Sequence, residues 1–218
     1  MSIYCRIATS IMLNPKKLKL AELEFLQRFP GGFSHPDMQA IGKKHNVTKM
    51  VDFAQASFTK KASKDIDTYA ENMIKIVSRS SMVSMFEKPK FRDFVRRLDP
   101  SEKAFLVKAQ HQILHGKQQA GFEAMIDLLQ TEKLAKWSLI SIIPAYFSPT
   151  VEVFVKPTTT KNVIAHFEID DLLYKPMPSW SFYFRYRDMI NSAKSKVDDS
   201  LSPSNAAFCG FLMMTMPK

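Results

Sequence analysis

Histidine and cysteine are the first residues to test for metal chemistry in this chain. His111 and His115 are four positions apart in a stretch that predicts a helix, so their rings can share one face. A zinc site needs at least one more ligand, and the position that a zinc protease fills with a catalytic glutamate is Gln112. Cys5 and Cys209 lie near opposite ends of the chain. We therefore predict a structural or solvated histidine pair, no metal and no cofactor.

Carboxylates and glycines form no recognisable catalytic motif. The pairs Asp170-Asp171 and Asp198-Asp199 are adjacent in sequence, and adjacent side chains point apart on a helix. No Asp-x-Lys or Glu-x-Lys of the common nucleases occurs. The six glycines form neither a dinucleotide fingerprint nor a nucleotide-cradling loop, and no Gly-x-Ser-x-Gly elbow is present. An enzyme would need a site that no motif reveals.

Basic side chains gather between residues 88 and 97, beside the apolar positions of a short predicted helix. They point away from that apolar side and are candidates for contacts with nucleic-acid phosphates. An ordinary solvated helix face is the alternative. The candidates are Lys88, Lys90, Arg92, Arg96 and Arg97.

Residues 41–48 resemble the first helix and turn of a helix–turn–helix motif. Three lysines in or next to this segment are candidates for contacts with DNA: Lys43, Lys44 and Lys49. Two positions depart from the motif, because His45 stands where an aliphatic residue packs and Asp52 where the recognition helix buries one. An ordinary helical hairpin is the alternative.

The stretch from Lys136 to Trp180 contains both tryptophans and five of the twelve prolines. We expect both tryptophans to be largely buried. If Lys156 points into the core it must find a carboxylate, because an unpaired buried ammonium is strongly disfavoured. Five residues of this stretch and of the helix that follows are candidates for a ligand pocket: Trp137, Lys156, Trp180, Tyr183 and Arg187.

The segment from Trp180 to Arg187 interleaves aromatic residues with arginines. Such a mixture can stack on single-stranded bases. However, Tyr183 and Arg187 are four positions apart, and aromatic stripes at helical spacing are usually part of the core.

The spacing of apolar residues predicts a mainly α-helical fold. Asp99, Pro100 and Glu102 form a capping-box pattern, which marks a strong helix start. Asn46 suits a left-handed turn between two helices. The expected helices cover residues 16–29, 36–45, 47–58, 65–86, 91–98, 100–115, 117–130, 131–143, 159–167, 180–196 and 203–214.

Any β-structure is expected between residues 151 and 169. Residues 151–155 alternate and are β-branched, which predicts a short extended piece. For residues 159–167 we prefer a helix to the second arm of a β-hairpin. We expect a single helical bundle-like domain over residues 1–218. A finer division would separate a helical body, 14–143, from a part rich in proline and aromatic residues, 144–218.

Composition places the chain among basic globular proteins. Of its 218 residues 45% are hydrophobic, and its net charge of +10 favours phosphate-bearing or acidic partners. No apolar run approaches the roughly 20 residues of a membrane span, and we predict neither a signal peptide nor a membrane partner. Two distant cysteines fit a reducing compartment, the cytoplasm. Met12 would also serve as a start, which leaves open whether residues 1–11 belong to the native protein.

The chain also resembles a group of bacterial proteins without an established activity. The similarity rests on the pair Lys136-Trp137, the box from Phe154 to Thr158 and the segment from Arg28 to Phe33. It covers about half of the chain and implies a bacterial, cytoplasmic origin.

Three functions follow as hypotheses. The first is a non-enzymatic, basic helical binding or accessory protein that touches nucleic acid or an acidic protein. The second is an enzyme or small-ligand binder with its site near Trp137, Lys156 and Trp180. The third is a protein-interaction module, including a homo-oligomer, that uses the many methionines and phenylalanines.

Overall fold

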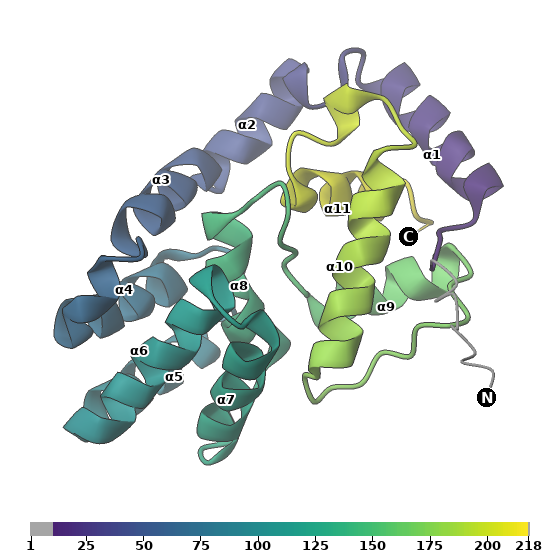
Figure 1. The fold of residues 1–218 in the computed structure, drawn as a ribbon. Coiled ribbons are helices and arrows are strands. Elements are labelled where there is room, and N and C mark those ends of the chain that lie inside the picture. The colour runs from purple at the N-terminus through teal and green to yellow at the C-terminus, as the bar shows by residue number, and fades with distance from the viewer. Residues whose placement is uncertain (1–10, 218) are drawn as a thin grey trace, which may run out of the picture.

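The computed structural model of the protein describes residues 11–217, which fold into eleven α-helices and three short 3-10 turns without any strand (Figure 1). The predicted mainly α-helical fold is confirmed, and residues 157–166 form a helix rather than a hairpin. The elements are α1 (Pro15–Arg28), η1 (Gly32–Ser34), α2 (Pro36–Lys44), α3 (Val47–Ser57), η2 (Ala62–Lys64), α4 (Ile66–Arg79), α5 (Glu87–Arg97), α6 (Pro100–His115), α7 (Gln118–Gln130), α8 (Trp137–Phe147), α9 (Pro157–His166), α10 (Trp180–Lys194), η3 (Asp199–Leu201) and α11 (Asn205–Met214).

Local capping chemistry sets several helix starts. At α6 the Asp99 carboxylate accepts from the Glu102 amide at 2.8 Å, and the Glu102 carboxylate accepts from the Asp99 amide at 3.0 Å. This is the predicted capping box, with Pro100 in the first turn. The Ser179 hydroxyl caps α10, and Asn46 takes the left-handed conformation at φ 51° between α2 and α3.

The helix expected over residues 65–86 is wrong in its second half. α4 ends at Arg79, where Ser80 leaves the helical conformation. The Ser80 hydroxyl is buried, contacts the Tyr146 hydroxyl at 3.0 Å and accepts from the Met82 amide. These side-chain bonds turn the chain. Pro89 then lies in the first turn of α5. A backbone N–H has no acceptor within the helix at such a position, so proline, which lacks this proton, is tolerated there.

The expected helix over residues 131–143 is also misplaced. α8 begins at Trp137 and continues through Pro144 to Phe147. An internal proline costs about 3 kcal/mol because it removes one backbone bond and crowds the preceding turn. Every residue of α8 from Trp137 to Tyr146 is buried, and we attribute the continued helix to this packing, which offsets the cost.

The connection between α8 and α9, residues 148–156, is called the strap below. It is a turn followed by an irregular segment, and the expected extended piece has no strand partner within residues 11–217. Neighbouring helices satisfy part of its backbone instead. Three side chains of α10 and α11 donate to strap carbonyls, Lys194 to Thr150, Asn191 to Val151 and Asn205 to Glu152, at 2.6, 2.8 and 3.1 Å.

The apolar core is one continuous cluster that extends from Leu13 to Leu212. The two ends of the described chain meet in it: the rings of Phe25 in α1 and Phe211 in α11 lie edge to face at 5.3 Å. Figure 1 shows α1 beside α11 and α9, two helices that come much later in the sequence. The first helix of the expected body, 14–143, therefore packs on the C-terminal part.

Candidate functional site

Glu152, in the strap, is the most heavily bonded carboxylate of the described residues. It is 8% exposed. Its Oε1 accepts from Arg187 Nη1 at 2.7 Å and from Gln118 Nε2 at 2.9 Å, and its Oε2 accepts from the Tyr183 hydroxyl at 2.7 Å. Burial, and then the Glu152 charge, raise the pKa of Tyr183 well above 10, so the phenol remains a donor. This carboxylate anchors the strap to α7 and α10.

Arg187 carries the same network to the protein surface. Its Nη1 also donates to Gln118 Oε1 at 2.7 Å, whereas its Nε and Nη2 make no hydrogen bond within residues 11–217. The guanidinium carbon lies 5.7 Å from the Trp180 ring centre and 5.6 Å from that of Phe184. Trp180 is half-buried and Phe184 is 46% exposed. We call Trp180, Phe184 and the Arg187 guanidinium the aromatic platform.

The structure brings four of the five predicted pocket residues into one cluster. Trp137, Trp180 and Tyr183 surround Phe122 of α7, with ring centres 6.4, 5.7 and 4.9 Å from it, and Arg187 joins them through its stack on Trp180. Trp137 is 1% exposed, as predicted, and its indole N–H donates to the Lys175 carbonyl at 2.8 Å. Trp180 is less buried than expected.

Lys156 does not join this cluster. It is exposed at the N-terminus of α9 and forms no ion pair within residues 11–217. The buried carboxylate of the strap is Glu152, and its cation is Arg187. The position of Lys156 in the strap explains why it is exposed. Val153 and Val155 point into the core, and the next side chain, that of Lys156, points into solvent.

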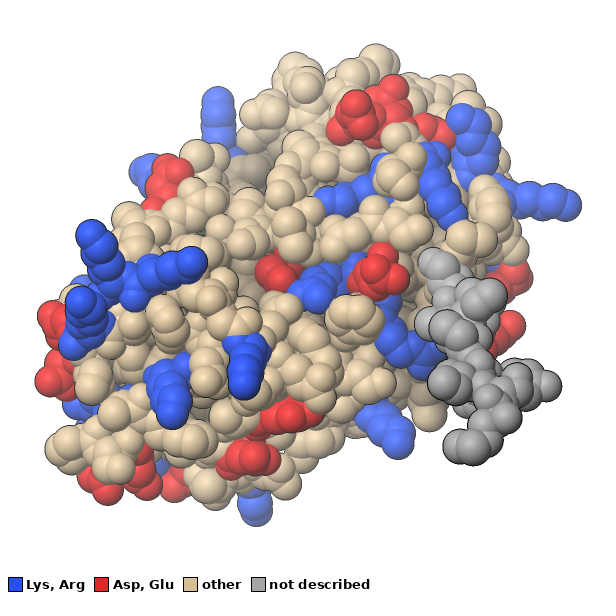
Figure 2. All heavy atoms as spheres, viewed as in Figure 1, with Lys and Arg blue, Asp and Glu red and all other residues tan. Residues whose placement is uncertain are grey.

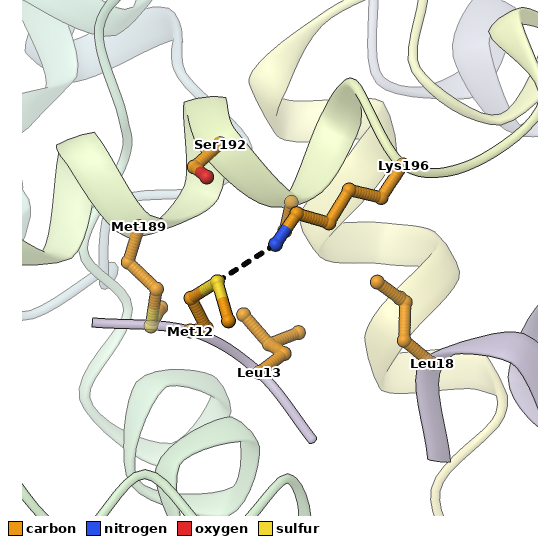
Figure 3. A pocket seen from close by; sticks show the side chains of 7 residues that line it. Met12, Leu13, Leu18, Met189, Ser192 and Lys196 are labelled. Carbon is orange, nitrogen blue, oxygen red and sulfur yellow. Dashed lines mark hydrogen bonds between the residues drawn. The ribbon is translucent and has the colours of Figure 1, made fainter. Parts of the chain in front are cut away.

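Two surface hollows are described, and neither is lined by the five predicted residues. One, between Leu13, Leu18 and α10, is too narrow for a water-sized sphere, and Lys196 points across it at Met12 Sδ, 2.9 Å away (Figure 3). The other, of about 340 Å³, lies between α4, α5 and α6. Two ion pairs line it, Lys103–Asp67 at 2.7 Å and Arg96–Glu71 at 3.4 Å.

The predicted basic face of α5 is largely neutralised. Each of its three arginines is exposed but lies beside a carboxylate: Arg92 by Asp93 at 2.8 Å, Arg96 by Glu71 at 3.4 Å and Arg97 by Glu132 at 3.6 Å. The Asp93 carboxylate raises the pKa of Arg92 further through their hydrogen bond. Lys88 is half-buried, and Lys90 is exposed.

The lysines around α3 present a different surface. Residues 43–64 contain six lysines and a single carboxylate, Asp52. All six are exposed, and none forms an ion pair within residues 11–217. Figure 2 shows blue side chains along the left of the molecule, where Figure 1 places α2, α3 and the turn into α4. We call Lys43, Lys44, Lys49, Lys60, Lys61 and Lys64 the lysine surface.

The helix–turn–helix hypothesis gains little from this arrangement. In Figure 1, α2 and α3 follow one another along the upper left edge rather than crossing. Val47 is half-buried, and Asp52, which replaces the usual aliphatic residue, is exposed. Lys43, Lys44 and Lys49 therefore contribute to a surface rather than to a recognition helix.

The histidine pair joins the lysine-bearing turn to α6. His115 Nε2 lies 2.7 Å from the carbonyl oxygen of Phe58, the last residue before the turn. The ring of His111 lies 5.1 Å from that of His115 and is tilted against it by 48°, and its buried Nδ1 has no hydrogen-bond partner among the described residues. Burial, then His115 and Lys60, lower the pKa of His111. These effects favour the neutral form of its ring.

Residues 11–217 bring together no group of three or more histidine, cysteine, aspartate or glutamate side chains that could hold a metal ion. Burial raises the pKa of the Cys209 thiol to about 11, which keeps the reactive thiolate scarce at neutral pH. Cys5 lies outside the described residues. None of the helices described has both the length and the apolar character needed to cross a bilayer.

Sequence reasoning missed Glu152, Gln118 and Phe122. A lone carboxylate inside the alternating apolar run 151–155 was a readable signal, because a buried glutamate requires a partner. Gln118 and Phe122 carried no such signal, since their role depends on how α7 meets α10. The three lysines of residues 60–64 belong to no motif in the sequence, and the structure links the turn that carries them to α6 through the contact between His115 and the Phe58 carbonyl.

Comparison with known proteins provides no relative: no family model, no curated protein and no solved structure matches the chain.

Proposed function

We propose that this protein is a non-catalytic binding protein that contacts the phosphates of nucleic acid through the lysine surface. One observation carries the proposal: six lysines between residues 43 and 64 are exposed and unpaired within the described chain, with one carboxylate among them. Flexible ammonium groups without internal partners are free to neutralise phosphates and release counterions. The paired arginines of α5 are less available for phosphate binding, because a phosphate must first displace the carboxylate beside each of them.

The setting that fits this proposal is the bacterial cytoplasm. The resemblance to a group of bacterial proteins supports the origin. The wide separation of Cys5 and Cys209 in sequence supports a reducing compartment. Nucleic acid is abundant there, and a net charge of +10 favours association with it.

The test compares two charge-removing variants of the same chain. In the first, Lys60, Lys61 and Lys64 are replaced by glutamine; in the second, Arg92, Arg96 and Arg97 are. Both remove three positive charges, so net charge alone predicts equal effects on binding. Affinity for a labelled duplex and a labelled single strand is measured from about 50 mM to about 200 mM salt.

We expect wild-type affinity to fall steeply with salt, and the lysine variant to bind more weakly with a shallower salt slope. For duplex, each lysine–phosphate contact that the variant no longer makes reduces the slope by about 0.9. The arginine variant should bind with an affinity and a salt slope closer to those of wild type. Absence of binding at about 50 mM salt, or equal weakening in both variants, would refute the assignment to the lysine surface. Equally tight binding of polyglutamate would indicate an acidic protein partner instead.

A second function, self-association or protein interaction, is favoured by the loop between α4 and α5. Met85 and Phe86 are both 80% exposed there, which is unusual for adjacent large apolar residues. Sedimentation velocity of wild type and Met85→Ser tests it: a dimer that this substitution dissociates supports the hypothesis, and a monomer at all concentrations removes it.

A further inference from the structure

The residues that join α6 to α7 connect the lysine surface to the aromatic platform. At one end of this joint, His115 contacts the Phe58 carbonyl at the start of the turn that carries Lys60, Lys61 and Lys64. At the other end, three residues later, Gln118 accepts a hydrogen bond from Arg187 at 2.7 Å. Lys117 lies between them and is exposed. A continuous series of contacts therefore leads from one polar surface to the other.

The platform offers what a nucleobase needs for stacking. Phe184 is 46% exposed and Trp180 is half-buried, whereas the Arg187 side chain is 14% exposed and lies behind these rings. The guanidinium carbon lies 5.7 and 5.6 Å from the centres of the two rings, which are tilted by 40° at a centroid distance of 5.9 Å, so the three planar groups form one cluster. Aromatic rings and arginine planes bind bases through their faces without regard to sequence.

Charge is divided unequally between the two surfaces. Glu152 occupies one edge of Arg187 at 2.7 Å and offsets its charge. The platform is therefore suited to stacking more than to electrostatic attraction. The attraction must come from the lysines at the other end and from Lys117. The exposed carboxylates Glu123 and Asp127 of the neighbouring α7 favour passage of a polyanion along the α6–α7 joint rather than along α7.

We propose that the ligand is single-stranded nucleic acid, with its backbone on the lysine surface and at least one base stacked on Trp180 and Phe184. This inference rests on the proposed function and narrows its substrate class. A duplex keeps its base faces inside the stack and presents only phosphates. A single strand satisfies both surfaces at once, because its bases are free to turn out of the backbone path.

Two measurements on the full chain test it. The probes are a labelled oligothymidine of about 16 nucleotides and a duplex of equal length. Affinities are measured for wild type, Phe184→Ala and the matched control Phe105→Ala, at a phenylalanine of α6 that is 45% exposed, close to the 46% of Phe184. In parallel, quenching of tryptophan fluorescence by oligothymidine is followed in wild type and in Trp180→Phe, which keeps only the buried Trp137.

We expect Phe184→Ala to weaken single-strand binding at least about fivefold, with duplex binding unchanged and Phe105→Ala equal to wild type. Oligothymidine should quench the wild-type fluorescence and leave that of Trp180→Phe nearly unaffected. Emission of Trp137 at the short wavelength of a buried indole shows that this variant is folded, because an unfolded chain emits at longer wavelength.

The outcomes separate this inference from the proposed function. If both probes bind with steep salt dependence and respond to the lysine variant, but Phe184→Ala changes nothing, the phosphate surface stands and the stacking platform is wrong. If neither probe binds at about 50 mM salt, both the proposed function and the stacking inference are refuted. Tighter binding of duplex than of single strand, or equal weakening in Phe184→Ala and Phe105→Ala, also overturns the inference.

Discussion

At the residue scale, Glu152 shows how one buried charge can determine a connection between helices. Three donors satisfy it, and their parent residues lie on α7 and α10. The ion pair with Arg187 has side chains that are 10% and 14% exposed, so water screens it far less than the surface pairs of this protein. Removing either partner would leave the other charge buried without compensation.

We therefore predict that Glu152→Ala and Arg187→Ala each lower the free energy of unfolding by about 3–5 kcal/mol. The double variant should cost much less than the sum, because each single change already breaks the pair. Urea unfolding of the four proteins gives the coupling. The matched control is the exposed pair Lys103–Asp67, for which Lys103→Ala should cost less than about 1 kcal/mol. Additive effects at Glu152 and Arg187 would contradict the coupling.

Trp137 is the second residue for which we predict a large contribution to stability. It is 1% exposed and packs against Phe122 and Phe182, and its N–H is satisfied by the Lys175 carbonyl. Trp137→Ala should lower the free energy of unfolding by about 3–5 kcal/mol, through reduced burial and the cavity that remains. Phe86→Ala, at an 80% exposed position, should change it little. A small effect at Trp137 in urea unfolding would show that its surroundings collapse to fill the space.

At the element scale, α6 and α7 approach each other closely at Gly121. A Cβ added at Gly121 would lie 2.6 Å from the Ala109 carbonyl oxygen and 2.7 Å from the Ile113 amide nitrogen. Both are backbone atoms of α6, so the two helices would have to separate. At Gly42 in α2, by contrast, an added Cβ meets nothing within 4 Å.

This contrast gives a paired prediction. Gly42→Ala should raise the free energy of unfolding by about 0.5–1 kcal/mol, since alanine is the better helix former. Gly121→Ala should lower it by about 1–3 kcal/mol despite the same gain in propensity, because the added methyl overpacks the helix pair. Thermal unfolding of the two variants measures both. Stabilisation by Gly121→Ala would show that α6 and α7 can part without cost.

At the scale of the whole molecule, the two ends of the described chain close one core. α1 packs on α11 through Phe25 and Phe211, and Trp137 lies in the same continuous cluster. A shared core predicts cooperative unfolding of both regions, as expected for one domain.

Phe211→Ala tests this cooperativity at a distance. Phe211 is 0% exposed, and the substitution should cost about 3–5 kcal/mol. Far-UV circular dichroism reports all helices, whereas tryptophan fluorescence reports the surroundings of Trp137 and Trp180. Both probes should shift to the same lower midpoint in urea. If the fluorescence midpoint stays at the wild-type value while the dichroism midpoint falls, the chain unfolds as two units.

The sequence by itself determined the features that depend on near neighbours. Asp99, Pro100 and Glu102 start α6, Ser179 caps α10, and Asn46 turns the chain after α2, because capping and turn geometry involve residues at most a few positions apart. The helical class follows from apolar spacing in the same way. The burial of Trp137 was also readable, from its apolar neighbours.

Only the tertiary structure decided the features that depend on contacts between distant segments. α8 continues through Pro144 because it is buried on all sides, and α4 stops at Ser80 because that hydroxyl meets Tyr146 across 66 positions. Arg187 rather than Lys156 became the partner of Glu152 for the same reason, since α10 reaches the strap and Lys156 points away from it. The connection from the lysine surface to the aromatic platform likewise exists only where α6 meets α7. Local spacing carries no information about such pairings, because their free energy comes from packing and desolvation that arise only when the helices assemble.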